Sequence, residues 1–470
     1  MTRSDLVVVG AGPAGMAAAA QAAELGLSVT VLDEQACAGG QIYRDVDRVV
    51  PLRGDILGAD YVHGTTLTAA LRRAAISHVT GAVVWAIEDA FRISYTREGR
   101  GVQIEADRIL LATGALERSM PLPGWTLPGV MTAGAGQILL KQSGVLARNA
   151  VLVGSGPLLY LIAAQMLRAG TPPKAMIETQ SRGDLIGATR HIGGALRGAS
   201  YLVKGLRMLA SIIRAGVPRH TGVTDIAVEG TDKAEAVTFQ SGRRSHRITC
   251  DTVFLHHGVV PNTQAARSLG VTHSWNTAQQ CFVPQLDDWG QSDRAGVFIA
   301  GDGAGIGGAK AAEHAGTLAA LQIACEAGRL SREERDRRAA APRAGLAHEL
   351  AARPFLDAAY PPYAPALLPD DSTPICRCEE VTAGDIRSYA KLGCIGPNQT
   401  KAFGRAGMGP CQGRYCGLSV TALLADATGR TPDETGYYRI RPPLKPVTLG
   451  ELAGMNITAP DTAEKEKAHD

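Results

Sequence analysis

The first forty residues contain the feature that most constrains the fold. Residues 6–9 form a short apolar run, and a G-x-G-x-x-G turn follows them. An alanine-rich segment comes next, and then a second apolar run that ends in an acid. This order of strand, glycine turn, helix, strand and carboxylate is typical of a βαβ dinucleotide-binding unit. We therefore expect an α/β fold that begins with a Rossmann-like domain.

The three glycines of the turn have different expected tasks. Gly10 allows the tight turn, Gly12 lets the backbone approach a pyrophosphate, and Gly15 lets the helix pack against the strand. Asp33 ends the second apolar run, where a carboxylate accepts hydrogen bonds from a ribose, and Glu34 could share that role. A glycine turn without a ligand is the alternative.

Two later segments would complete the same site. Residues 107–114 read as a buried strand that ends in A-T-G, so Thr113 and Gly114 would turn close to a cofactor. Residues 296–303 read as a strand that ends in G-D-G, where Asp302 could accept a hydrogen bond from a sugar or ribityl hydroxyl. Each segment also has a plainer interpretation, a turn without a ligand in the first and a helix N-cap at Asp302 in the second.

A second, incomplete fingerprint follows residues 150–153. Gly154 and Gly156 come after an apolar run, and Glu178 lies close to the spacing expected for a ribose acid, but Leu159 replaces the third glycine. The pattern predicts a second Rossmann-like domain. The leucine leaves open whether its pocket binds a nucleotide or is empty or altered. If it binds one, Glu178 favours a free ribose over a 2′-phosphate.

Composition argues against several other classes of protein. The chain has 48 Lys and Arg residues against 45 Asp and Glu, and only 5% aromatic residues, so nucleic-acid binding is not expected. No apolar run reaches the length of a membrane span, and the apolar N-terminus fits the nucleotide fold better than a signal peptide. We expect a cytoplasmic protein, with peripheral membrane association left open.

A helix is predicted over residues 195–215, with apolar residues at helical spacing and basic residues on its other faces. The favoured interpretation is a helix packed on its own domain, and the alternative is one that lies on a membrane or a partner. The apolar positions are Leu202, Leu206, Leu209 and Ile213. The histidines at 256, 257 and 314 are expected to be structural.

Five of the nine cysteines lie between residues 376 and 416. Four of them form a C-x-C pair and a later C-x4-C pair, and these are Cys376, Cys378, Cys411 and Cys416. Four thiolates are the ligand set of a [2Fe–2S] cluster. Zinc is an alternative, although its usual ligand spacings leave two to four residues between cysteines, and free thiols are another. Arg377 and Arg414 would ease the charge of a cluster.

Several longer motifs resemble the two-dinucleotide-domain flavoproteins related to thioredoxin reductase. They are G-A-G-P-A-G, D-E-Q-A-C-A-G-G-Q-I-Y-R, A-T-G-A-x-E-R-x-x-P-x-P-G-W and I-A-G-D-G-A-G-I-G-G-A-K. Two further features make the resemblance more specific. They are the four cysteines and the later motif R-P-P-L-K-P-V-T-L-G-E-L. With them, the chain is similar to the flavin-containing α-type subunits of bacterial opine and D-hydroxyproline dehydrogenases and hydrogen cyanide synthase.

The resemblance implies FAD at the first glycine turn, a bound [2Fe–2S] cluster and a partner β subunit with its own flavin, which oxidises the amine. A small ferredoxin-like γ subunit is a further candidate partner. The candidate FAD-binding residues are Gly10, Gly12, Pro13, Ala14, Gly15, Asp33, Glu34, Gly40, Gln41, Thr113, Gly114, Gly301 and Asp302. Gly154, Gly156 and Glu178 would hold a second nucleotide, NAD(H) or ATP.

The expected architecture is α/β, with two Rossmann-like domains and a small helical cysteine-rich domain. Residues 1–120 and 246–330 would form a discontinuous FAD domain, and residues 121–245 a second, NAD(P)-binding-like domain. A proline-rich linker is expected over 331–371, a [2Fe–2S]-binding domain over 372–430, and a docking segment with a flexible tail over 431–470.

The expected function is that of an electron-transfer subunit in a heteromeric amine or amino-acid dehydrogenase. Residues 129–136 lack the redox cysteine pair of disulfide reductases, and no residue stands out as a general base. The C–N chemistry is therefore expected on a partner. Two alternatives remain open: a stand-alone NAD(P)H:acceptor oxidoreductase and a non-catalytic nucleotide-binding assembly subunit.

Overall fold

The first domain is built on a seven-stranded sheet. The structure, a computed structural model, describes residues 2–455. In its first sheet the strand order is β3-β2-β1-β6-β5-β4, and β19 pairs with β6. Strands β1, β2, β3, β6 and β19 are parallel, while β4 and β5 are antiparallel to their neighbours. Their bounds are β1 (Thr2–Val9), β2 (Val29–Asp33), β3 (Ile76–Thr80), β4 (Val83–Ile87), β5 (Arg92–Arg97), β6 (Arg100–Leu111) and β19 (Val297–Ile299).

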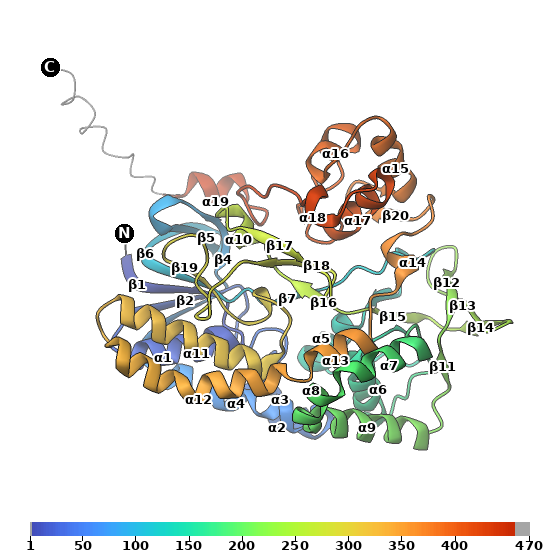
Figure 1. Ribbon diagram of the computed structural model, residues 1–470, viewed down its shortest axis with the longest axis horizontal. Coiled ribbons are helices and arrows are strands. Elements are labelled where there is room, and N and C mark those ends of the chain that lie inside the picture. Colours follow the sequence, from blue (N-terminus) through green and yellow to red (C-terminus); the bar gives the residue numbers. More distant parts are fainter. Residues whose placement is uncertain (1, 456–470) are drawn as a thin grey trace.

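Small residues let two helices pack closely together beside this sheet. The alanine-rich helix α1 (Pro13–Glu24) lies beside α11 (Ala309–Glu326), as Figure 1 shows. Gly316 in α11 is so close that a Cβ there would lie 2.2 Å from the carbonyl oxygen of Ala14. The other helices of this domain are α2 (Val46–Leu57), α3 (Ala59–Val62), α4 (Gly64–Arg73) and α10 (Gln264–Ser268).

The second domain contains a five-stranded parallel sheet with the order β11-β10-β9-β15-β8. A separate three-stranded antiparallel sheet, β12-β13-β14, extends from it. The strands are β8 (Val130–Thr132), β9 (Ala150–Gly154), β10 (Ala175–Glu178), β11 (Arg219–Thr221), β12 (Thr224–Glu229), β13 (Ala236–Ser241), β14 (Arg244–Thr249) and β15 (Thr252–His256). The helices are α5 (Ala133–Ser143), α6 (Pro157–Arg168), α7 (Arg182–Ala188), α8 (Ile192–Arg197) and α9 (Ala199–Arg214).

Two short antiparallel strands carry the chain between the domains. The chain leaves the first domain through β7 (Ala115–Glu117) and returns through β16 (Val259–Pro261). The expected boundary at residue 246 is too early, because β15 lies between β9 and β8 in the second sheet. An apolar strand pattern predicts burial, but it does not say which of two sheets the strand joins.

The predicted linker over 331–371 is largely helical. Helix α12 (Arg332–Leu350) continues through Pro342 and is followed by α13 (Arg353–Ala359) and α14 (Ala364–Leu367). A proline inside a helix costs about 3 kcal/mol. Packing of α12 along α11, with Ala339 fully buried, offsets this cost.

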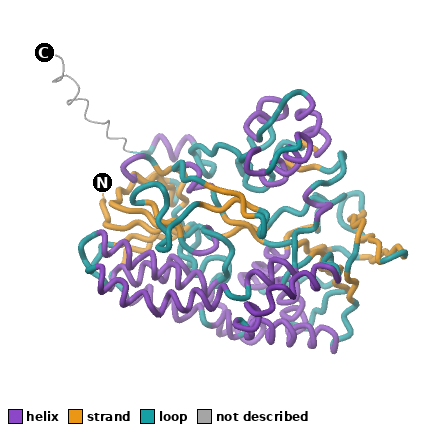
Figure 2. The backbone as a smooth tube through the Cα atoms, in the orientation of Figure 1, coloured by secondary structure: helices purple, strands orange, loops and turns teal. Residues whose placement is uncertain are grey.

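The cysteine-rich domain is helical, as Figure 2 shows. Thr382 caps α15, because its side chain accepts a hydrogen bond from the backbone N–H of Asp385. The domain does not end at residue 430, since the buried Tyr438, Ile440 and Leu444 belong to its core. Its elements are β20 (Pro374–Cys376), β21 (Val381–Thr382), α15 (Ala383–Lys391), α16 (Pro397–Gly404), α17 (Gly417–Thr428) and α18 (Pro432–Thr435).

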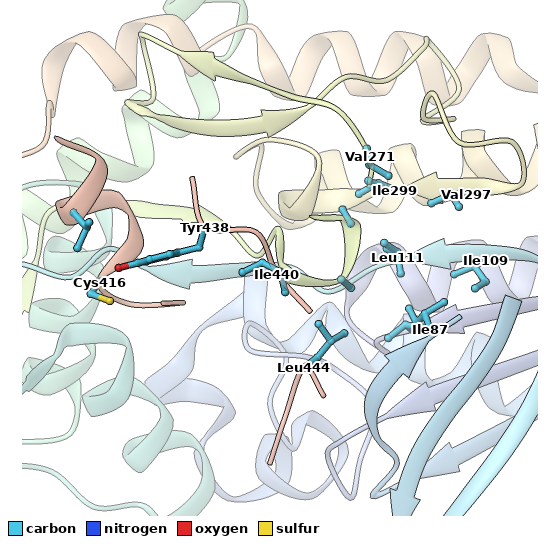
Figure 3. Packing of buried hydrophobic residues seen from close by; sticks show 14 of the residues in the cluster. Ile87, Ile109, Leu111, Val271, Val297, Ile299, Cys416, Tyr438, Ile440 and Leu444 are labelled. Carbon is cyan, nitrogen blue, oxygen red and sulfur yellow. The ribbon is translucent and has the colours of Figure 1, made fainter. Parts of the chain in front are cut away.

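The core of the cysteine-rich domain is continuous with that of the first domain. Figure 3 shows Tyr438, Ile440 and Leu444 leading from Cys416 toward the apolar residues of the first sheet. Two further strands, β17 (His273–Asn276) and β18 (Cys281–Pro284), lie in the same region. Helix α19 (Leu449–Ala453) then packs against β6. The expected tail over 456–470 lies outside the described residues.

The helix predicted over 195–215 is divided into α8 and α9 by Gly198. A Cβ at Gly198 would lie 2.8 Å from the Cβ of Ala352, so the break allows close packing of residue 352. Among the described residues, no helix is both long enough and apolar enough to cross a bilayer.

Candidate cofactor sites

The first glycine turn has the close packing that its motif predicts. Gly10 has a φ of +106°, and a Cβ there would lie 2.4 Å from the carbonyl oxygen of Ala112. A Cβ on Gly15 would lie 1.9 Å from the carbonyl oxygen of Gly10. Pro13 is the first residue of α1, where the missing N–H costs nothing. These two glycines are therefore required by the fold itself.

Gly12 and Gly40 instead form an open cradle. A Cβ on Gly12 would lie 3.9 Å from the Cα of Gly40, which is ordinary contact. A Cβ on Gly40, whose φ is +59°, would lie 2.9 Å from the Cα of Gly12. The two backbones face each other at the N-terminus of α1, where the helix dipole favours a phosphate. The residues present fit a dinucleotide pyrophosphate.

The two acids at the end of β2 point in different directions. Asp33 is buried and accepts hydrogen bonds from the backbone N–H groups of Ala11, at 2.5 Å, and Gln35, at 2.7 Å. Burial raises the pKa of Asp33 despite these bonds. Glu34 is more exposed, and its carboxylate lies 2.8 Å from Nζ of Lys445. Asp33 thus holds the turn, and Glu34 presents a carboxylate beside it.

The carboxyl ends of β6 and β19 bring the other candidates to the same place. Gly303 faces Thr113 and Gly114, since a Cβ there would lie 3.5 Å from atoms of both. Gly301, with a φ of +77°, packs against Ala14 of α1. Oδ1 of Asp302 accepts hydrogen bonds from the N–H groups of Gly307 and Gly308, both at 2.9 Å. Asp302 therefore holds the turn before α11, but it does not cap that helix, whose N-cap residue is Gly308 and has no side-chain cap.

Sequence reasoning missed Lys141, a buried lysine of α5 beside this site. Its Nζ donates hydrogen bonds to the carbonyl oxygens of Gln41 and Ile42, at 3.1 and 2.9 Å, and to Oε1 of Gln137. Burial and the nearby Arg44 lower the pKa of Lys141 to about 7. Lys141 thereby ties the segment after Gly40 to the second domain. No motif marks it, because two of its partners are backbone atoms far away along the chain.

The four expected cysteines come together as two pairs, each with one member from each motif. Sγ of Cys378 lies 4.0 Å from Sγ of Cys411, and the thiols of Cys376 and Cys416 form a hydrogen bond. That bond and backbone N–H groups, including that of Gly407, lower the pKa of Cys376 to about 6. Gly409 makes room, since a Cβ there would lie 2.2 Å from the Cβ of Cys378.

The pairwise arrangement suits two metal atoms better than one. Two thiolates on one tetrahedral metal atom, with metal–sulfur bonds near 2.3 Å, lie about 3.8 Å apart. Within residues 2–455, no group of three or more Cys, His, Asp or Glu residues is arranged around a single ion. A [2Fe–2S] cluster needs two thiolates on each iron. The residues present therefore fit that cluster.

The two arginines expected to ease the cluster charge make contacts with other groups. Arg377 stacks over the ring of Trp125, 5.2 Å from its centroid. Arg414 donates a hydrogen bond to the carbonyl oxygen of Leu444 at 2.8 Å. The first contact holds the cysteine-rich domain to the second domain, and the second holds Leu444 within the cysteine-rich domain. The expectation that they ease the cluster charge has no support in their contacts.

A short strap, residues 440–445, joins the cysteine-rich domain to the first glycine site. The N–H of Leu444 donates to the carbonyl oxygen of Trp85 at 2.6 Å, and Lys445 pairs with Glu34. On the other side of the junction, the guanidinium of Arg267 lies between the rings of Phe282 and Tyr437, at 4.8 and 4.4 Å. Burial lowers the pKa of Arg267 to about 10. The two candidate sites are thus parts of one packed unit.

The second glycine turn is covered by the chain itself. Residues 154–156 are all buried, and Oγ of Ser155 donates a hydrogen bond to the carbonyl oxygen of Pro361 at 3.2 Å. The ring of Tyr360 packs edge-on against Tyr160 of α6, with centroids 6.2 Å apart. Leu159 is fully buried in the domain core. The segment after α13 therefore lies where a nucleotide phosphate would have to approach the turn.

Glu178 does not present a carboxylate to this pocket. It is only 1% exposed, and Arg219 donates to its two oxygens at 2.6 and 2.7 Å. The hydroxyl of Tyr160 and the amide of Gln180 donate to the same carboxylate, each at 2.5 Å. These four bonds use the acceptor sites that a ribose would need. The expected ribose role of Glu178 is contradicted by this geometry.

The two neighbouring histidines are held by protein groups. Nε2 of His257 donates to the carbonyl oxygen of Ser119 at 2.7 Å, and its Nδ1 accepts from the N–H of Tyr363 at 3.2 Å. Burial lowers the pKa of His257 to about 3, so it stays neutral. His256 Nδ1 lies 2.6 Å from Oε1 of Glu117. Both contacts agree with the expected structural role.

The comparisons with known proteins agree with this arrangement. Residues 4–319 match the pyridine nucleotide-disulphide oxidoreductase family, and residues 371–455 match the sarcosine oxidase A3 domain. The chain is 44% identical over 459 residues to the A subunit of opine oxidase from Rhizobium meliloti (strain 1021), and the match covers 97% of this chain and 99% of that protein. It is 32% identical over 462 residues to hydrogen cyanide synthase subunit HcnB from Pseudomonas protegens, covering 94% and 96%.

A solved structure supports the fold. L-Proline dehydrogenase from P. horikoshii superposes with a TM-score of 0.72 at 18% identity, and the match covers 96% of this chain and 79% of that one. This similarity confirms the predicted α/β fold. The resemblance inferred from the motifs is confirmed by the family match and by the two relatives, which align over nearly their full length. The chain belongs to the pyridine nucleotide-disulphide oxidoreductase family and, within it, to the α-type flavoprotein subunits of the opine oxidase kind.

Proposed function

We propose that this chain is the electron-transfer flavoprotein subunit of a heteromeric dehydrogenase that oxidises an amine or amino acid. Its substrate would be of the opine, D-hydroxyproline or glycine type. In this proposal electrons are relayed between a partner flavin, a [2Fe–2S] cluster and FAD on this chain, and then to an acceptor. The observation that carries it is the packing of the cysteine-rich domain onto the first dinucleotide domain, with Cys376 and Cys416 in the core that the two domains share.

Each cofactor would be held by residues that fit it. FAD, which accepts and donates one or two electrons, would lie on the cradle of Gly12 and Gly40, with Asp33 and Glu34 beside it. The cluster, a one-electron carrier, would be held by the four paired cysteines. The strap at residues 440–445 keeps the two binding regions in a fixed relation, as Figure 3 shows for its buried residues.

The two cysteine pairs differ in exposure. Cys376 and Cys416 are buried against Tyr438, on the side of the first domain. Cys378 is exposed and Cys411 is half-buried. The outer pair would lie toward a docked partner and the inner pair toward the FAD domain. A β subunit with its own flavin, and a small ferredoxin-like subunit, are the partners that this arrangement suits.

The isolated chain is expected not to oxidise opines, D-hydroxyproline or glycine. The two buried histidines lie beside the second glycine turn and are held by Ser119, Tyr363 and Glu117, which indicates structural roles. Activity with an artificial electron acceptor should appear only when the β subunit is added. The measurement is dye reduction by the purified chain alone and by the reconstituted complex. Full amine oxidation by the chain alone would contradict the proposal.

NADH is expected to leave the flavin of this chain oxidised. The second glycine turn is buried beneath Pro361, and Glu178 is bonded to Arg219, so the nicotinamide nucleotide has no prepared pocket. The measurement is anaerobic flavin absorbance after addition of millimolar NADH, with dithionite as the control for complete reduction. Mass spectrometry of nucleotides released on denaturation should find FAD alone. Rapid loss of the flavin absorbance after NADH addition would favour a stand-alone NAD(P)H:acceptor oxidoreductase. A stoichiometric second nucleotide would favour a nucleotide-binding assembly subunit.

A further inference from the structure

Two buried cations lie beside the first glycine turn without an acidic partner. Arg44 is 6% exposed and Lys141 is 2% exposed. Among residues 2–455, every hydrogen bond that either side chain donates goes to an uncharged oxygen atom. A buried charge is normally paired with an opposite charge, because water no longer solvates it. These two cations therefore call for an anion from elsewhere.

The guanidinium of Arg44 joins the two ends of the loop that carries Gly40. Its Nη1 donates to Oε1 of Gln35, which follows β2, and its Nη2 donates to Oε1 of Gln41 at 2.7 Å. Its Nε is buried, and in the described part of the chain it has no hydrogen-bond partner. Because Gln41 directly follows Gly40, Arg44 keeps a free donor group close to the cradle of the first turn.

Lys141 approaches the same loop from the second domain. Its Nζ lies 3.1 Å from the carbonyl oxygen of Gln41 and 5.6 Å from the centroid of the Tyr61 ring in α3. Burial and the nearby charge of Arg44 lower the pKa of Lys141 to about 7. On its other side, Arg53 of α2 donates to the carbonyl oxygen of Lys141 at 3.1 Å. Burial raises the pKa of Tyr61, so the groups that face Lys141 are two cations and a neutral phenol.

The two acids at the end of β2 do not balance these charges. Glu34 is already paired, since its carboxylate lies 2.8 Å from Nζ of Lys445. Asp33 is buried, and its two oxygens accept hydrogen bonds from backbone N–H groups of the turn. Neither acid forms an ion pair with Arg44 or Lys141. Charge balance at this loop therefore depends on a bound anion.

We propose that Arg44, supported by Lys141, binds the diphosphate of the dinucleotide held at the first glycine turn. The inference rests on the proposed function only in placing a dinucleotide at this turn. A diphosphate ester carries two negative charges at neutral pH, which balance the charges of the two cations. Arginine suits phosphate oxygens because its planar group donates parallel N–H bonds, and the N-terminus of α1 offers further N–H groups.

Titration of FAD into the full chain, after its own flavin has been removed, tests the role of Arg44. Arg44→Met should bind FAD about 30-fold more weakly, because a hydrogen bond from a charged donor is lost. Arg44→Lys keeps the positive charge, so its affinity should stay within about fivefold of the wild type. A lysine cannot bridge Gln35 and Gln41 as a guanidinium does. Arg44→Lys therefore separates charge pairing from a purely structural role in the loop.

The pH dependence of FAD binding tests the role of Lys141. A bound diphosphate favours the charged amine, so binding should raise the pKa of Lys141 and take up a proton. The affinity for FAD, measured by flavin fluorescence, should be about tenfold lower at pH 8.5 than at pH 6.5. Lys141→Met should bind FAD weakly and without this slope. Arg44→Met should move the slope to higher pH, because the repulsion that lowers the pKa of Lys141 is gone.

Arg48→Met is the matched control for these variants. Arg48 is an exposed arginine on α2 that pairs with Asp45 at 2.7 Å. This variant should keep the affinity and the pH profile of the wild type. Unchanged circular dichroism would show that each variant is folded.

The possible failures of this inference and of the proposed function differ. The inference fails if Arg44→Met binds FAD as tightly as the wild type, if Arg44→Lys binds as weakly as Arg44→Met, or if wild-type affinity does not change with pH. The FAD site itself would stand in each of these cases. A wild type that binds no FAD would instead overturn that site, and inorganic pyrophosphate would then be the probe. Pyrophosphate binding that Arg44→Met loses would support the two cations, and absence of binding to the wild type would overturn them.

Discussion

Cys411→Ser is expected to remove the iron–sulfur cluster from this chain. The iron content should fall from about two atoms per chain to below about 0.2, because one iron would lose a thiolate that an alcohol does not replace at neutral pH. Cys411 suits the test since it is half-buried and is paired with Cys378 at the outer side of the domain. The measurements are iron and sulfide content, visible absorbance and electron paramagnetic resonance after reduction.

Cys394→Ser provides a matched control for this variant. Cys394 lies in the same domain and is fully buried, but its Sγ donates only to the carbonyl oxygen of Gly396, at 3.4 Å. A serine hydroxyl can make the same bond, so the iron content should stay near that of the wild type. If zinc rather than iron copurifies with the wild type, or if Cys411→Ser retains its iron, the assignment of the four cysteines is wrong.

Gly12→Ala is expected to abolish FAD binding without unfolding the chain. The new Cβ meets only the Cα of Gly40, at 3.9 Å, so the protein itself accommodates it. It would nevertheless occupy the space through which the turn approaches a pyrophosphate. The ratio of flavin to protein should fall from about one to below about 0.1, measured by absorbance after denaturation. The midpoint temperature of thermal unfolding should fall to that of the flavin-free wild type, because bound FAD stabilises only the folded chain.

Two other glycine variants separate ligand binding from folding. Gly15→Ala would place its Cβ 1.9 Å from the carbonyl oxygen of Gly10, so this chain should lose soluble expression as well as flavin. Gly187→Ala meets nothing within 4 Å on the exposed α7, so it should keep its flavin and gain up to about 1 kcal/mol of stability. Stoichiometric flavin in Gly12→Ala would contradict the placement of FAD on this turn.

Local patterns were sufficient where the physical requirement is local. Gly10 and Gly15 of the first turn are fixed by close contacts within one strand–turn–helix unit and the strand beside it, so their spacing predicts them. The Thr382 cap of α15 is local in the same sense, because its partner, Asp385, belongs to the first turn of the same helix. The four cysteines were recognisable by residue type and spacing, although their pairing across the two motifs was not.

The errors arose where a distant segment decides the environment. Glu178 has the right spacing for a ribose acid, but Arg219 and Tyr160 bind its carboxylate. Residues 331–371 were expected to form a proline-rich linker, but packing of α12 on α11 keeps a helix through Pro342. The predicted boundary at residue 246 failed because β15 completes the second sheet.

The sequence by itself determined the α/β class, the first dinucleotide turn, the set of four cysteines and the family. Each of these depends on residue types at fixed short spacing, which a linear pattern records. Only the tertiary structure decided that Tyr360 and Pro361 cover the second glycine turn, that a strap from the cysteine-rich domain reaches Glu34, and that Lys141 of α5 reaches the segment after Gly40. All three features join segments that are far apart in the chain. The burial and charge pairing that stabilise these features involve residues from distant parts of the sequence, so a short stretch of sequence does not contain them.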